Sequence, residues 1–138
     1  MYNKGKAFIG AAILLSRETA SEHSDYVVLH LLCQGIELVL KGLLLDRDYD
    51  RYFPRLPRSL GHDLKKIALE TASAYGRKLP RGGVVTELEA LSTLYKQHLL
   101  RYGGVSDMHV DPRTIRRDKV LRYVTAVLRL AERPRSQE

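Results

Sequence analysis

The sequence has one cysteine and no tryptophan among its 138 residues. A single cysteine cannot form an internal disulfide, and it excludes zinc sites built from paired cysteines. Cys33 lies in a strongly apolar stretch, so we expect a small buried side chain and a cytoplasmic, reducing location. No two histidines have the spacing of metal ligands on one helix, and we expect neither a metal nor another cofactor.

The sequence also lacks an uninterrupted hydrophobic run that could cross a membrane. The apolar stretch from Tyr26 to Leu45 is interrupted by His30, Gln34, Glu37 and Lys41, which would be costly in lipid. We therefore expect no membrane association. A hydrophobic content of 44% and a charged content of 28% are typical of a globular chain of one core. We predict one domain over residues 1–133 and a disordered basic tail over 134–138.

No segment alternates between polar and apolar residues as a half-buried strand does, and every periodic segment has the period of a helix. We predict an all-α fold, a compact up-and-down bundle of about five helices. The predicted helices cover residues 4–18, 25–45, 61–76, 86–102 and 112–133. The side chains predicted to face inward from the first and last helices are Phe8, Ala11, Ala12, Leu15, Val120, Leu121, Val124, Val127, Leu128 and Ala131.

Capping residues define several of the predicted helix boundaries. Gly76 is a natural left-handed end for the third helix. Thr86 and Glu89 have the spacing of a capping box, which predicts that the fourth helix begins at Thr86 after a loop over 80–83. Asp111 followed by Pro112 predicts the start of the fifth helix. Residues 46–60, which include two prolines, are predicted to form the longest irregular connection.

The net charge is +7, and most of the excess lies near the end of the chain. Residues 113–135 contain eight Lys or Arg and two acids. This distribution suits an anionic partner, such as RNA, a nucleotide or an acidic protein. The alternative is a solvated helix face with no partner.

Four polar residues follow one side of the predicted second helix, because His30, Gln34, Glu37 and Lys41 are spaced four, three and four apart. The helix is apolar nearly all round, so we expect part of this stripe to be shielded from water. Glu37 and Lys41 have the favourable order for an ion pair. The candidate partners from other helices are His62, Tyr95, Arg101 and Tyr102. Two interpretations remain open, a buried network that fixes helix register, and a polar cleft that binds an anion or positions a catalytic histidine.

Three motifs resemble those of HEPN-domain proteins. The Gln-x-x-Glu-x-x-x-Lys pattern at 34–41 resembles the signature of their long second helix. Gly-His-Asp-Leu at 61–64 resembles the opening of their next helix, and Arg101-Tyr102 resembles a later Arg-Tyr pair. The resemblance extends from about Ala7 to Val127. It implies a helical bundle that often forms a homodimer, in a family of metal-independent endoribonucleases, RNA-binding modules, partners of nucleotidyltransferases and inactive scaffolds.

Catalytic HEPN proteins carry an arginine, four to six residues and then a histidine, and Arg55 and His62 match this pattern. The resemblance implies that His62 is an acid or base in RNA cleavage and that Arg55 or Arg101 holds the phosphate. Arg58 would add to an anion site at the unpaired N–H groups of the third helix. The predicted function is RNA-related, a metal-independent endoribonuclease of a defence or toxin system. The alternative is a non-catalytic homodimeric module that binds a nucleotide or protein, in which His62 only bonds to Glu37.

Overall fold

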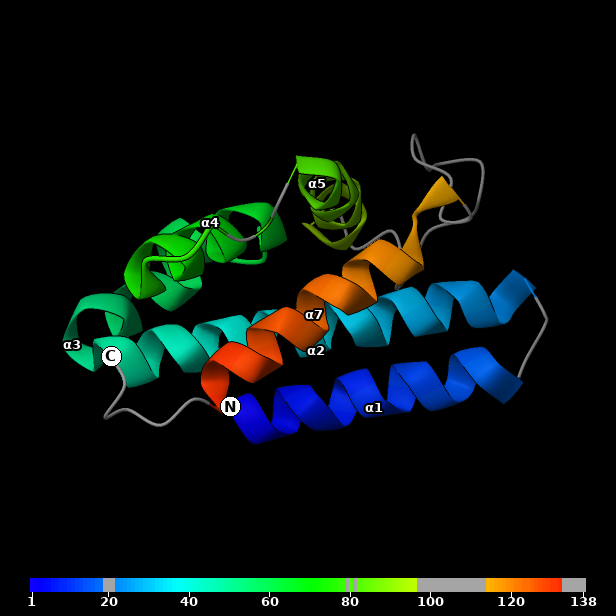
Figure 1. Cartoon of the computed structure of the whole chain (residues 1–138), viewed down its shortest axis with the longest axis horizontal. Coiled ribbons are helices and arrows are strands. Elements are labelled where there is room, and N and C mark those ends of the chain that lie inside the picture. Colours follow the sequence, from blue (N-terminus) through cyan, green and yellow to red (C-terminus); the bar gives the residue numbers. More distant parts are fainter. Residues whose placement is uncertain (19–21, 79, 81, 97–113, 133–138) are drawn as a thin grey trace.

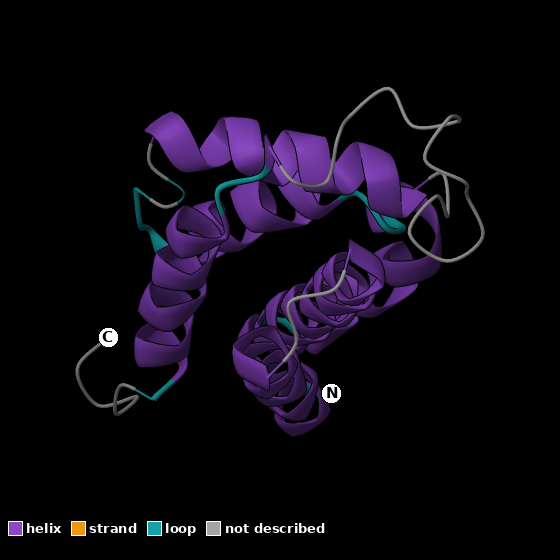
Figure 2. Ribbon diagram, turned by 90° about the vertical axis from the view of Figure 1, so that its right-hand side faces the viewer, coloured by secondary structure: helices purple, strands orange, loops and turns teal. Residues whose placement is uncertain are grey.

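Helices make up most of the described chain, which in this computed structural model comprises residues 1–18, 22–78, 80, 82–96 and 114–132. Figure 2 shows helices and loops and no strand within these ranges, which confirms the all-α prediction. The elements are α1 (Tyr2–Glu18), α2 (Glu22–Arg47), α3 (Tyr49–Tyr52), a 3₁₀ turn η1 (Phe53–Arg55), a π turn η2 (Leu56–Leu60), α4 (Leu64–Tyr75), α5 (Gly82–Lys96) and α7 (Arg117–Ala131).

The long helix α2 lies at the centre of the molecule and contacts α1, α3, α4, α5 and α7. Figure 1 shows α1 and α2 as an antiparallel pair, with α7 lying across them and α4 and α5 above. Helix α5 is seen nearly end-on in Figure 1 and along its length in Figure 2, so it crosses α2 at a steep angle. The five predicted helices correspond to α1, α2, α4, α5 and α7.

Two glycines allow α1 and α2 to pack closely. A Cβ atom added to Gly5 would lie 2.8 Å from the carbonyl oxygen of Gly35 and 2.7 Å from the backbone nitrogen of Val39. A Cβ atom on Gly35 would in turn lie 2.5 Å from a side-chain carbon of Ile9. Both glycines are therefore required by helix packing, not by a turn.

This contact decides which face of α1 is buried, and the predicted face is only partly correct. Ile9 and Ala12 are in the core, whereas Phe8 and Leu15 are only partly buried and Ala11 is exposed. Periodicity allowed either stripe because α1 is apolar on several sides. The buried face of α1 is the one that carries Gly5, since a residue without a side chain lets the two helix backbones approach.

The prediction that residues 46–60 form an irregular connection is also wrong, because the segment is a series of short helical turns. Asp48 caps α3 by accepting the N–H of Arg51 at 3.2 Å. Pro54 and Pro57 occupy the first turns of η1 and η2, where a proline removes no required hydrogen bond. The buried side chains of Tyr52, Leu56 and Leu60 anchor the segment to the core.

Helix α5 begins four residues before the predicted capping box, at Gly82. Thr86 is therefore inside the helix, and residues 82–83 do not belong to a loop. This first turn of α5 packs against the segment that begins α7. Glu87 accepts the backbone N–H of Arg116 at 3.0 Å, and a Cβ atom on Gly83 would lie 3.3 Å from Nζ of Lys119.

Helix α7 begins at Arg117, later than the predicted fifth helix. Asp111 and Pro112 lie outside the described residues, and Arg116 is the residue before the helix. Of the predicted inner face, Val120, Val124 and Val127 are buried and the other members are partly buried. Tyr123 is buried as well, which the prediction missed.

The apolar character of α2 follows from its central position. By length and composition alone, Tyr26–Arg47 could cross a membrane, contrary to the interpretation that its polar residues interrupt it. In the structure, 67% of its most apolar window is buried against the rest of the protein. Cys33 is one of these core residues and is a free thiol, and burial raises its pKa.

Candidate functional site

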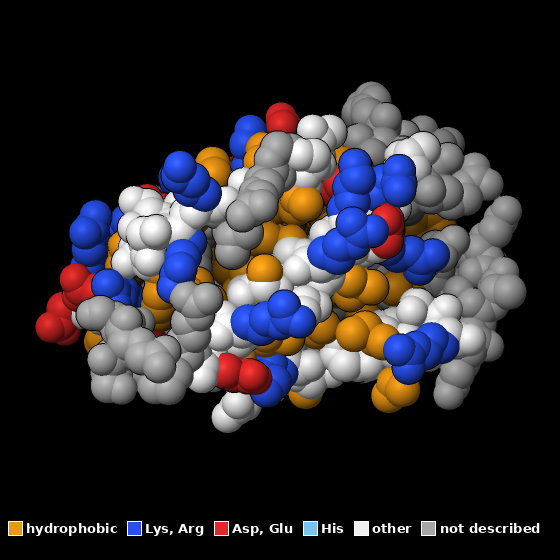
Figure 3. Space-filling view, viewed as in Figure 1, with side chains coloured by type: hydrophobic (Ala, Val, Ile, Leu, Met, Phe, Trp, Pro, Cys, Tyr) orange, Lys and Arg blue, Asp and Glu red, His pale blue; other side chains and the backbone are white. Residues whose placement is uncertain are grey.

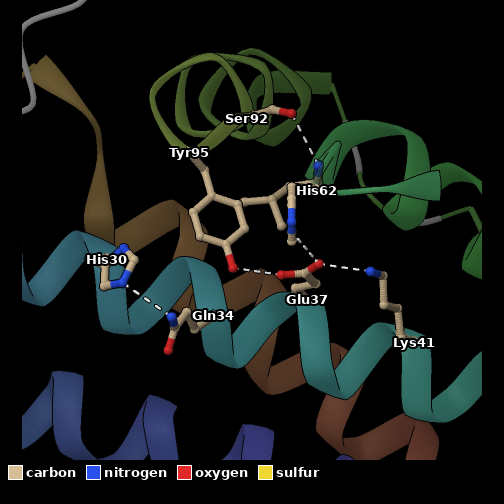
Figure 4. Close-up of polar contacts among 8 residues, drawn as sticks. His30, Gln34, Glu37, Lys41, His62, Ser92 and Tyr95 are labelled. Carbon is tan, nitrogen blue, oxygen red and sulfur yellow. Dashed lines mark hydrogen bonds and ion pairs between the residues drawn. The ribbon is translucent and has the colours of Figure 1, made fainter. Parts of the chain in front are cut away.

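A buried carboxylate, that of Glu37, is the centre of a polar cluster between α2, α4 and α5 (Figure 4). Its Oε1 atom lies 2.7 Å from Nζ of Lys41 and 2.8 Å from Nδ1 of His62. Its Oε2 atom accepts the hydroxyl of Tyr95 at 2.5 Å. The ion pair predicted from spacing, Glu37–Lys41, is confirmed, and so are two of its four predicted partners. Arg101 and Tyr102 lie outside the described residues.

Both members of the ion pair are shielded, with side-chain exposures of 8% for Glu37 and 10% for Lys41. Removing a carboxylate and an ammonium group from water is costly, and the cost is recovered only when hydrogen bonds satisfy them. Glu37 receives three donors from three different elements, Lys41, His62 and Tyr95. The network therefore ties α5 and the turn before α4 to α2.

The turn before α4 places the His62 side chain over Glu37. Gly61 has a φ of 52° and a ψ of −129°, a conformation that residues with a Cβ atom rarely adopt. The Gly61 N–H closes the preceding π turn on the carbonyl of Leu56 at 3.1 Å. The chain thus reverses at Gly61, and His62 is the first side chain after the reversal.

The next two residues of the Gly-His-Asp-Leu motif fix the start of α4. Asp63 accepts the N–H of Lys66 at 3.1 Å and the hydroxyl of Ser92 at 3.1 Å. The N–H of Leu64 donates to Ser92 at 3.0 Å, and the Leu64 side chain is buried. Two of the N–H groups expected to be open to an anion are thus already bonded. The expected anion site at this helix end is therefore not supported.

Sequence reasoning missed Ser92, although it links α5 to the cap of α4. The only signal is its position three residues before Tyr95, on the same face of α5. A serine with that position could equally lie at the surface, so the partner could not be read from spacing.

The other two residues of the polar stripe form a separate contact. Nε2 of Gln34 lies 3.1 Å from Nε2 of His30, and both side chains are partly buried. The His30 ring lies 6.0 Å from the ring of Tyr95, which connects this pair to the Glu37 cluster by packing. The stripe is therefore one continuous polar line along α2 beneath α5 (Figure 4).

Arg55 and His62 bond to different parts of the protein. Arg55 donates to Oε1 of Glu70 on α4 at 2.7 Å and to the hydroxyl of Ser59 at 3.1 Å. The hydrogen bond from Arg55 holds the pKa of Glu70 below its ordinary value, and the same bond raises the pKa of Arg55. Arg58, in η2, is exposed.

The Glu37–His62 pair defines the chemistry that the site could perform. An ionised carboxylate only accepts hydrogen bonds, so Nδ1 of His62 must be protonated and act as the hydrogen-bond donor to Glu37. In the neutral ring, Nε2 is then the basic nitrogen. The His62 side chain is 55% exposed, whereas that of Glu37 is 8% exposed. An accessible base backed by a buried carboxylate is an arrangement that can transfer protons.

Within the part of the chain that the structure describes, no group of three His, Cys, Asp or Glu side chains could hold a metal ion. The fold and the site thus define an all-α helical bundle with a buried carboxylate–histidine pair. Comparisons of the chain with models of known protein families, with curated proteins and with solved structures found no match.

Proposed function

We propose that this chain is a cytoplasmic, HEPN-like protein of a defence or toxin system that cleaves RNA without a metal ion. The observation that carries the proposal is the Glu37–His62 pair, in which a buried carboxylate orients an imidazole that is 55% exposed. A carboxylate at one ring nitrogen fixes the tautomer and stabilises the protonated ring. The net charge of +7 supports an RNA partner.

In the proposed reaction, Nε2 of His62 removes the proton from a ribose 2′-hydroxyl. The 2′-oxygen attacks the adjacent phosphorus, and the bond between phosphorus and the 5′-oxygen breaks. The imidazolium returns its proton to the leaving 5′-oxygen, which gives a 2′,3′-cyclic phosphate and a 5′-hydroxyl. Glu37 stabilises the imidazolium, and Arg58, which is exposed in η2, is the candidate among the described cations of the motif to stabilise the charge on the phosphate.

The test is incubation of labelled single-stranded RNA with the protein in EDTA, using wild type, His62→Ala and Arg122→Ala. Arg122 is a matched control because its side chain on α7 is 80% exposed. We expect wild type and Arg122→Ala to give equal amounts of cyclic-phosphate ends, and His62→Ala to be slower by about 10²-fold or more. Absence of cleavage by wild type, or equal cleavage by His62→Ala, would overturn the catalytic proposal.

The pairing of Arg55 with Glu70 favours a second candidate, a non-catalytic homodimeric module that binds a nucleotide or another protein. An arginine whose Nη2 and Nε atoms already bond to Glu70 and Ser59 is less able to hold a phosphate. Light scattering combined with a titration against ATP tests this candidate. A monomer that binds no nucleotide would count against it.

A further inference from the structure

An open groove of about 490 Å³ runs along α4 beside α3. Figure 3 shows Lys and Arg side chains at this end of the molecule beside acidic ones, and a second group of Lys and Arg over α7. The groove begins at Asp63, the residue directly after His62. The side chains that line it include Arg51, Asp63, Lys65, Lys66, Leu69 and Glu70.

The positive charges in this α4 groove exceed the negative ones. Asp63 already accepts hydrogen bonds from the backbone N–H of Lys66 and from the hydroxyl of Ser92. Glu70 is paired with Arg55. Besides Arg55, both Arg51 and Lys66 lower the pKa of Glu70, so three cations surround one carboxylate. Lys65 adds a fourth, and its contact with Glu89 is a long 3.4 Å between exposed groups. The groove lining itself has three cations, Arg51, Lys65 and Lys66, against two engaged carboxylates, and Arg55 pairs with one of these carboxylates from outside the lining.

We propose that the α4 groove binds the phosphodiester backbone of single-stranded RNA and delivers it to His62. This inference rests on the proposed function and assigns the path of its substrate. Helix α4 has 12 residues. That length corresponds to about 18 Å of helix, so the groove can follow several nucleotides of one strand. Leu69 is 46% exposed and offers an apolar surface for a ribose or base.

The basic face of α7 carries more cations than the groove, with Arg116, Arg117, Lys119, Arg122 and Arg129 against Asp118 and Glu132, and is the competing RNA path that the test must exclude. Asp118 accepts a hydrogen bond from Arg116 at 3.3 Å and lies 3.6 Å from Arg122, so this one carboxylate partly neutralises two arginines. The Arg116 hydrogen bond lowers the pKa of Asp118, which keeps this compensating charge ionised. His62 does not line the two cavities that residues of α7 share with α1 and α2, nor the α4 groove itself, which begins at the next residue, Asp63.

The test measures binding of a fluorescent single-stranded oligoribonucleotide in EDTA, with His62→Ala in every protein to prevent cleavage. Arg51→Ala/Lys66→Ala removes two charges from the groove, and Arg122→Ala/Arg129→Ala removes two from α7. We expect the groove pair to weaken binding about tenfold and to reduce the salt dependence by about 1.4 in log–log slope, since each phosphate contact on a single strand contributes about 0.7. We expect the α7 pair to change binding by about twofold or less at about 0.15 M salt. AMP at equal phosphate concentration should not displace the oligonucleotide.

Equal losses from both pairs, or a larger loss from the α7 pair, would overturn the groove assignment and leave the proposed cleavage intact. Displacement by AMP would show a mononucleotide site and would also overturn it. If wild type fails to cleave RNA in the cleavage test but the groove pair still weakens RNA binding, the groove assignment stands and the cleavage proposal is overturned. Circular dichroism checks folding, and Lys66→Gln, an exposed single substitution, repeats the comparison if the double variant unfolds.

Discussion

Nδ1 of His62 lies 2.8 Å from Oε1 of Glu37, across 25 residues of sequence. The same oxygen accepts Lys41 from the next turn of α2. One carboxylate oxygen thus carries a local contact that the helix spacing dictates and a long-range contact that the turn at Gly61 creates. A substitution at Glu37 therefore affects both helix α2 and the placement of His62.

Glu37→Ala is expected to lower the free energy of unfolding by about 3–5 kcal/mol, because it leaves the buried ammonium of Lys41 without a counter-charge. Urea unfolding monitored by circular dichroism measures the loss. Glu37→Met/Lys41→Met removes both charges and should recover much of the stability. A loss below about 0.5 kcal/mol for Glu37→Ala would be that of an exposed pair and would contradict the burial of this network.

Tyr95→Phe is expected to cost about 1.5–3 kcal/mol, because it removes a hydrogen bond to a charged acceptor while the ring stays in place. Tyr75→Phe is the matched control. Its hydroxyl donates to the neutral carbonyl of Leu43 at 2.8 Å and is expected to be worth about 0.5–1.5 kcal/mol. Thermal or urea unfolding gives both values, and the opposite ranking would mean that Glu37 does not hold a full charge.

Gly35→Ala is expected to destabilise the protein by about 1–3 kcal/mol, because the added methyl group would overlap Ile9 and push α1 away. Gly10→Ala in the neighbouring helix α1 should have the opposite sign. A Cβ atom at Gly10 meets nothing within 4 Å, and alanine is the better helix former by about 0.5–1 kcal/mol. Denaturant midpoints compare the two variants directly. Stabilisation by both would show that the two helices are not in close contact.

The Arg55–Glu70 pair predicts a pH dependence of stability. The pKa of Glu70 is lowered in the folded protein by the Arg55 hydrogen bond, from an ordinary value of 4.5. The pair therefore contributes fully above that value, and its contribution is lost as the pH falls through the lower folded pKa. The side chains are 30% and 28% exposed, so we expect on the order of 1 kcal/mol.

Urea unfolding at pH 7 and near pH 3 tests this dependence. Glu70→Gln should lose less stability than wild type as the medium is acidified. Glu89→Gln, whose carboxylate is exposed and lies 3.4 Å from Lys65, serves as the control and should follow wild type. A Glu70→Gln curve parallel to that of wild type would show that the pair does not contribute.

Helical periodicity predicted the helix set and part of the site, because residues three and four apart on a helix meet whatever surrounds them. That rule predicted the Glu37–Lys41 pair. The end of α4 was predicted as well, since Gly76 adopts φ 62° and no side-chain partner is needed for such a stop. His62 and Tyr95 were predicted as partners of Glu37 only by type, as polar residues in neighbouring helices.

The partner of Arg55 could not be predicted in this way. A basic residue in a proline-containing segment can turn either towards His62 or towards α4, and spacing along the sequence does not distinguish these directions. The structure turns it towards Glu70 because residues 46–60 coil into consecutive helical turns. The same coil places Arg51 beside the α4 groove, which no local pattern indicated.

The sequence by itself determined that the described chain is helical, that Gly76 would end α4, and that Glu37 and Lys41 would meet. These properties depend on contacts within a few residues. Only the tertiary structure decided which face of α1 is buried, where α5 and α7 begin, and that Arg55 pairs with Glu70. Those outcomes depend on how closely two backbones approach and on which distant side chain fills a hydrogen bond, and both are properties of packing.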